Sequence, residues 1–75
     1  MTTKTEQAFM IDCIVADLAV YLMRDYHLDE EEALRTIYNS EYYERLSDPS
    51  TGFFIESSPY NYHHLRHELQ YGTVI

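Results

Sequence analysis

Apolar residues recur with helical spacing through the first third of the chain. Between residues 8 and 23 the only charged side chains are Asp12 and Asp17, and this stretch contains neither glycine nor proline. It is too long for a strand and too uniformly apolar for a loop. The pattern therefore predicts a helix from Glu6 to His27.

The predicted helix has two apolar faces, because a helix turns by about 100° per residue. One face comprises Ile11, Val15, Leu18 and Leu22, with Ile14 and Tyr21 beside them. The opposite face comprises Phe9, Cys13, Ala16, Val20 and Met23. A surface helix of a small protein normally has one apolar stripe, so this helix needs cover on two sides.

We expect the first face to form the core and the Phe9–Met23 face to form a homodimer interface. A chain of 75 residues has little material left for covering a second face. The alternative is a helix sandwiched inside the bundle of a single chain. A membrane span is not expected, because Asp12 and Asp17 would be costly in lipid.

Two further helices are predicted after His27. Asp29 and Glu32 have the spacing of a capping box, which starts a second helix with Ala33, Leu34, Ile37 and Tyr38 on its apolar face. We place a break at Asn39-Ser40, where Ser40 caps a third helix that ends at Leu46. A single bent helix is the competing interpretation.

Residues 47–52 are typical of a turn, and an apolar run, Phe53–Ile55, follows them. We expect this run to be extended, either plugging the core or forming a small edge strand. Ser58 as the cap and Pro59 as the first residue open a last helix, which ends at Tyr71 before Gly72. The chain is thus predicted to be one all-α domain, residues 1–75, a small bundle of three to four helices with a long N-terminal helix.

The last helix also has two faces. Tyr62, Leu65 and Leu69 share the face that we assign to the core. Tyr60, His64, His67 and Tyr71 share the other face, at spacings of four, three and four residues. This stripe is aromatic and can donate or accept hydrogen bonds, so we predict that it binds a partner protein.

The composition bears on partners and location. Thirteen acidic and five basic residues give a formal net charge of −8, which disfavours direct binding to nucleic acid and favours a more basic protein partner. High solubility explains the same charge without any partner. Cys13 is the single cysteine, so an internal disulfide is excluded and a cytoplasmic location is expected.

Candidate chemistry is sparse. His63 and His67 have a spacing that suits zinc, but no nearby residue completes a ligand set, and a pair of His64 with Glu68 is the simpler expectation. The chain has only two glycines and no nucleophile motif, so no catalytic residue, metal site or cofactor is predicted. An acidic interaction module is therefore the leading hypothesis. The alternatives are a metal-binding regulator that uses its histidines and an acidic mimic of nucleic acid.

The middle of the chain resembles a family of short uncharacterised bacterial proteins, some of them encoded beside toxin-like genes. The resemblance covers roughly residues 15–70 and rests on structural motifs. These are Tyr38-Asn39-Ser40, Tyr42-Tyr43, Leu46, Asp48-Pro49, Thr51-Gly52-Phe53-Phe54, Ser57, Tyr60 and Leu65. It implies a bacterial, cytoplasmic helical protein with an antitoxin-like partner role, and it implies no functional residues.

Overall fold

The computed structural model describes residues 4–73 as a succession of helices. The four α-helices are α1 (Lys4–Tyr26), α2 (Glu30–Tyr38), α3 (Glu41–Ser47) and α4 (Ser58–Tyr71). Two short 3₁₀ helices, η1 (Pro49–Thr51) and η2 (Phe53–Ile55), connect α3 to α4. These residues contain no strand, which confirms a small all-α bundle with a long N-terminal helix.

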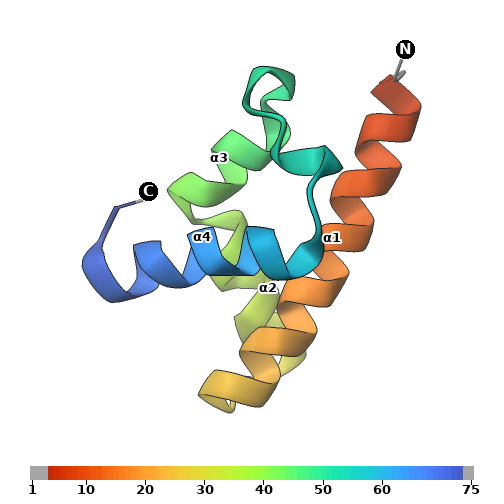
Figure 1. Ribbon diagram of the computed structural model, residues 1–75. Coiled ribbons are helices and arrows are strands. Elements are labelled where there is room, and N and C mark those ends of the chain that lie inside the picture. The colour runs from red at the N-terminus through yellow and green to blue at the C-terminus, as the bar shows by residue number, and fades with distance from the viewer. Residues whose placement is uncertain (1–3, 74–75) are drawn as a thin grey trace.

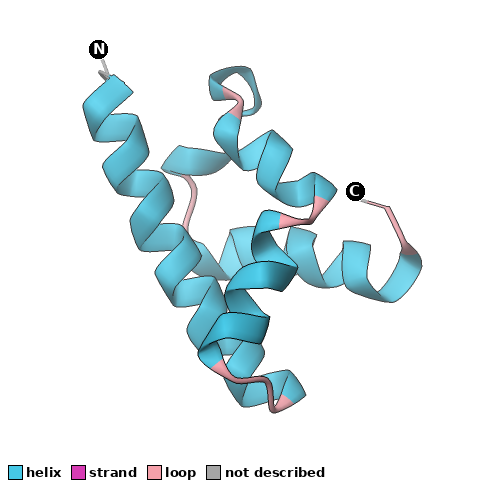
Figure 2. Cartoon of the chain, turned by 180° about the vertical axis from the view of Figure 1, so that it is seen from behind, coloured by secondary structure: helices cyan, strands magenta, loops and turns pink. Residues whose placement is uncertain are grey.

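The long helix α1 is the element on which the others assemble. It contacts α2, α4 and η2. In Figure 1, α1 extends along one side of the molecule. α4 begins beside α1 and runs away from it to the opposite side. Figure 2 shows the same arrangement from behind, with α2 folded back along the second half of α1.

The core is built on the predicted inner face of α1. This helix buries Ile11, Ile14, Val15, Leu18, Ala19 and Leu22. The other elements contribute Ala33, Ile37, Tyr42, Leu46, Phe54, Tyr62 and Leu65. The prediction for the inner face of α1 is therefore confirmed.

Leu69 does not belong to this core, and its assignment to the core was wrong. Its side chain is 40% exposed. The last turns of α4 project away from α1 (Figure 1). Leu69 lies one turn beyond the buried Leu65, so it has passed the edge of the core.

The predicted boundary between α1 and α2 is confirmed. The amide of Glu32 donates to Asp29 Oδ1 (2.8 Å), and the amide of Asp29 donates to Glu32 Oε1 (3.3 Å). Both halves of the capping box are thus present. α1 ends at Tyr26, and His27 has a φ of 57°, the left-handed conformation in which helices commonly stop.

The predicted break between α2 and α3 is also confirmed, and the single bent helix is excluded. The hydroxyl of Ser40 accepts a hydrogen bond from the amide of Tyr43 (3.1 Å). The same hydroxyl donates to the carbonyl of Ile37 (2.6 Å). One side chain therefore satisfies backbone groups at the end of α2 and at the start of α3.

Two predictions between α3 and α4 were wrong. Phe53–Ile55 is neither extended nor a strand but the 3₁₀ helix η2, which follows Gly52 in a left-handed conformation (φ 72°). Phe54 nevertheless enters the core. The cap of α4 is Ser57, whose hydroxyl accepts from the amide of Tyr60 (3.2 Å). Ser58, the predicted cap, instead donates to Asp17 of α1 (2.6 Å).

A buried polar pair fastens α3 to α4. The Tyr42 hydroxyl donates to Asn61 Oδ1 (2.5 Å), and both residues are fully buried. Asn61 Nδ2 donates in turn to the carbonyls of Phe53 (2.9 Å) and Ser57 (3.0 Å). Burial raises the pKa of Tyr42, so its hydroxyl stays protonated and remains a donor.

Removing the Tyr42 hydroxyl should destabilise the protein. Tyr42→Phe leaves the buried Asn61 oxygen without its donor, which should lower the free energy of unfolding by about 1–3 kcal/mol. Tyr38→Phe removes a hydroxyl from a half-exposed ring of α2 and serves as the control. Urea titrations that gave the two variants the same stability would contradict this role of the pair.

Candidate functional site

The outer face of α1 is an apolar feature that the fold leaves uncovered. Phe9 is 68% exposed and Val20 is 60% exposed. The remaining members of the predicted dimer interface, Cys13, Ala16 and Met23, are exposed as well. The residues of α1 that the fold buries all lie on or beside its inner face. The sandwich alternative is therefore wrong, whereas the homodimer contact stays a prediction.

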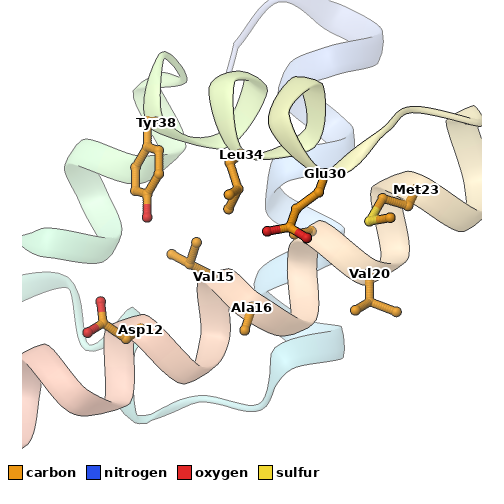
Figure 3. A pocket seen from close by; sticks show the side chains of 9 residues that line it. Asp12, Val15, Ala16, Val20, Met23, Glu30, Leu34 and Tyr38 are labelled. Carbon is orange, nitrogen blue, oxygen red and sulfur yellow. The ribbon is translucent and has the colours of Figure 1, made fainter.

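Part of this face forms the floor of a groove between α1 and α2 (Figure 3). The groove has a volume of about 410 Å³. Its apolar lining consists of Val15, Ala16, Ala19, Val20 and Met23 from α1 and Leu34 from α2. Three residues of the predicted outer face, Ala16, Val20 and Met23, thus line one groove with Leu34 of α2.

The charged side chains that line the groove are acidic. They are Asp12 of α1 and Glu30 of α2. The arginines of the same two helices are paired elsewhere: Arg24 with Asp25 (2.8 Å) and Arg35 with Glu31 (3.0 Å). The groove therefore presents a negative potential around an apolar floor.

The Arg24–Asp25 pair also connects α1 to α4. The Tyr62 hydroxyl donates to Asp25 Oδ2 (2.7 Å). Hydrogen bonds from Arg24 and Tyr62 hold the pKa of Asp25 well below its ordinary value. The Asp25 carboxylate is therefore ionised and bonded to Arg24 and Tyr62 within the chain.

The predicted partner-binding stripe of α4 separates into two pairs of rings. Tyr60 and Tyr71 are exposed, but His64 and His67 are half-buried. His64 lies with its ring 4.7 Å from the Tyr60 ring, and His67 lies 4.8 Å from Tyr71. The two histidines are therefore less accessible to a partner than the two tyrosines. Contact of this stripe with a partner stays a prediction.

His64 belongs to an aromatic cluster that covers η2. Its ring stacks on Phe53 at 4.7 Å, and its Nδ1 is buried without a hydrogen-bond partner. Burial lowers the pKa of His64, and the neighbouring His63 and His67 lower it further. The neutral imidazole is thus the form that this packing favours.

Glu68 does not form the expected pair with His64. Its carboxylate accepts hydrogen bonds from the amides of Glu41 (2.9 Å) and Tyr42 (2.7 Å), at the N-terminus of α3. A carboxylate is stabilising there because the first amides of a helix lack partners within the helix and carry a partial positive charge. Glu68 is therefore a cap supplied by a distant helix.

The histidines of α4 offer little to a metal ion. Among residues 4–73, no group of three or more His, Cys, Asp and Glu side chains is arranged to hold one. The surface beside His63 and His67 is also lined by Arg66, whose positive charge opposes a second cation.

Comparison with protein-family models found no match, and comparisons with curated proteins and with solved structures found none either. The resemblance to short bacterial proteins therefore stays a prediction. In the part of the chain that the structure describes, no helix combines the length and the hydrophobicity that crossing a membrane requires.

The contribution of α2 to the groove was missed in the sequence. Glu30, Leu34 and Tyr38 are each four residues apart, which places them along one side of a helix. Leu34 and Tyr38 were instead predicted to share one apolar face with Ala33 and Ile37. Only the latter two are buried. The four-residue spacing of Glu30, Leu34 and Tyr38 was visible in the sequence. The side of α2 that faces α1, however, depends on the turn at His27, which this spacing does not determine.

The buried environment of His64 should make stability depend on pH. Its pKa in the folded protein lies below the ordinary value of 6.5, so the unfolded chain takes up the proton first as the pH falls. The free energy of unfolding should therefore decrease from about pH 7.5 to about pH 5.5. His64→Phe keeps an aromatic ring and removes this titration, so it should show a smaller decrease.

Urea titrations at both pH values test this expectation. His63→Gln changes the exposed neighbour and should retain most of the decrease. An equal decrease in wild type and His64→Phe would show that other groups cause it.

Proposed function

We propose that this protein is a small acidic interaction module that binds a more basic protein partner through the outer face of α1. It acts by binding rather than by catalysis, and its place of action is the cytoplasm. The resemblance to proteins encoded beside toxin-like genes would make this an antitoxin-like or regulatory role.

The exposed apolar face of α1 carries this proposal. Five residues, Phe9, Cys13, Ala16, Val20 and Met23, are exposed along one side of a single helix. Scattered apolar residues on a surface are ordinary, but a contiguous patch usually marks a contact site. Exposed Phe9 and Val20 gain free energy when a partner removes them from water.

The charge of the chain favours a basic partner. The formal net charge is −8, and Asp12 and Glu30 lie in the groove beside the apolar face. Such a surface speeds encounter with positively charged proteins and opposes encounter with nucleic acid. The apolar contact then lies at the centre and the acidic groups lie around it, as in ordinary protein interfaces.

Two alternative functions, a homodimer and a mimic of nucleic acid, differ from this proposal in what they bind. A homodimer would cover the outer face of α1 with a second copy. A mimic of nucleic acid would bind mainly through its charge, so its binding would weaken steeply with salt, whereas a contact centred on Val20 and Phe9 would weaken much less.

Photo-crosslinking from Cys13 tests the proposal, because the single thiol lies on the exposed face. A benzophenone maleimide at Cys13, illuminated in a lysate of the source cells, should give one dominant adduct with a basic protein. The variant Cys13→Ser/Gln70→Cys carries the same probe beside the α4 stripe and should give little adduct. Mass spectrometry identifies the attached protein.

Titration calorimetry with the identified protein, purified, completes the test. Val20→Ser should weaken binding by roughly tenfold, whereas Tyr71→Ser should leave it nearly unchanged. An adduct from position 70 alone would move the contact to the α4 stripe. An adduct of two copies of this chain would replace the basic partner by a homodimer. Either outcome would overturn the proposal.

A further inference from the structure

We infer that the groove between α1 and α2 binds an α-helix of the partner, with apolar side chains along one face and lysine or arginine on both flanks. This inference rests on the proposed function and specifies the chemistry of the partner.

The groove has the dimensions of a site for a short helix. Its α1 wall extends from Asp12 to Met23, which corresponds to about 16 Å at 1.5 Å per residue. Its α2 wall runs in the opposite direction, from Glu30 near Met23 to Tyr38 at the Asp12 end (Figure 3). About three turns of a third helix match this length, and laying an apolar helix face into such a groove is a common mode of peptide recognition.

The floor of the groove is shaped for apolar side chains. Ala16 is exposed and carries only a Cβ atom, so it leaves a hollow among the larger lining residues. In Figure 3, Leu34 of α2 points toward Val15 of α1. Side chains of a bound helix could enter the hollow as knobs enter holes in a coiled coil.

The acidic residues are placed to select the flanks of the bound helix. Asp12 lies toward the end of the groove where Tyr38 is found, and Glu30 lies near Met23 (Figure 3). Carboxylates at separate positions along an apolar floor favour lysine or arginine on both sides of the apolar face of the ligand. Acidic flanks on a ligand would be repelled by the same groups.

This charge distribution disfavours a second copy as the occupant. The charged residues between positions 8 and 23 of the chain are Asp12 and Asp17, both acidic. A two-fold contact through α1 would therefore set acidic flanks against the acidic lining of the groove. Each copy would also bring a formal net charge of −8.

A designed peptide provides the probe. It is a fluorescein-labelled alanine-based helix of about four turns, with leucines at spacings of four, three and four residues and lysines on both flanks. Its control carries glutamate in place of every lysine. Fluorescence anisotropy should show saturable binding of the lysine peptide and no binding of the glutamate peptide.

Paired variants locate the site. Asp12→Asn/Glu30→Gln should weaken binding of the lysine peptide by roughly fivefold to tenfold, whereas Glu41→Gln/Glu44→Gln removes the same charge from α3 and should change it little. Ala16→Phe fills the floor of the groove and should abolish binding. Ala8→Phe adds the same ring at an exposed site of α1 outside the groove lining and should not.

Several outcomes would overturn the inference. Equal binding of the two peptides would exclude charge selection, and equal weakening by the two charge variants would mean that the net charge alone is recognised. Light scattering that revealed a dimer dissociated by Ala16→Phe would assign the groove to a second copy. If Cys13 cross-links to a basic protein whose binding tolerates Ala16→Phe, the groove inference fails and the proposed function stands. If the cross-link is absent as well, both fail.

Discussion

The fold depends on the burial of one face of α1. Leu18 and Leu22 of this face are fully buried, and residues from every other α-helix pack into the same core. A domain of this size has a small margin between the free energy gained by apolar burial and the conformational entropy lost on folding. The inner face of α1 supplies the longest continuous part of that burial. The shorter helices need it because none of them is long enough to be stable alone in water.

Specific polar contacts then fix how the short helices sit on α1. The Tyr42–Asn61 pair and the Glu68 carboxylate both join α3 to α4, and Ser58 and Tyr62 join α4 to α1. Apolar packing is tolerant of small rotations, whereas a buried hydrogen bond is costly to leave unmade. These contacts therefore define orientation, while the core supplies most of the driving force.

Local features of this chain could be predicted from the sequence, and long-range features could not. The capping box at Asp29, the break at Ser40 and the stop at Gly72 are each encoded within a few residues, and all are present. The role of Glu68 was missed because its partners lie 26 and 27 residues away. Phe53–Ile55 was assigned an extended form because its composition is typical of strands, yet no second strand exists among residues 4–73 to pair with it. The groove likewise depends on how α2 returns along α1.

The outer face of α1 is exposed because the other helices pack their apolar side chains into the core on its inner face. The inner face uses apolar side chains to hold three short helices, and the described residues leave the opposite side exposed. Folding does not require Phe9 and Val20 to be apolar, since they contribute little to burial within the chain. Their hydrophobicity costs solubility, and the formal net charge of −8 offsets that cost. An apolar face that folding does not use, kept beside acidic groups, is best explained by a partner that uses both.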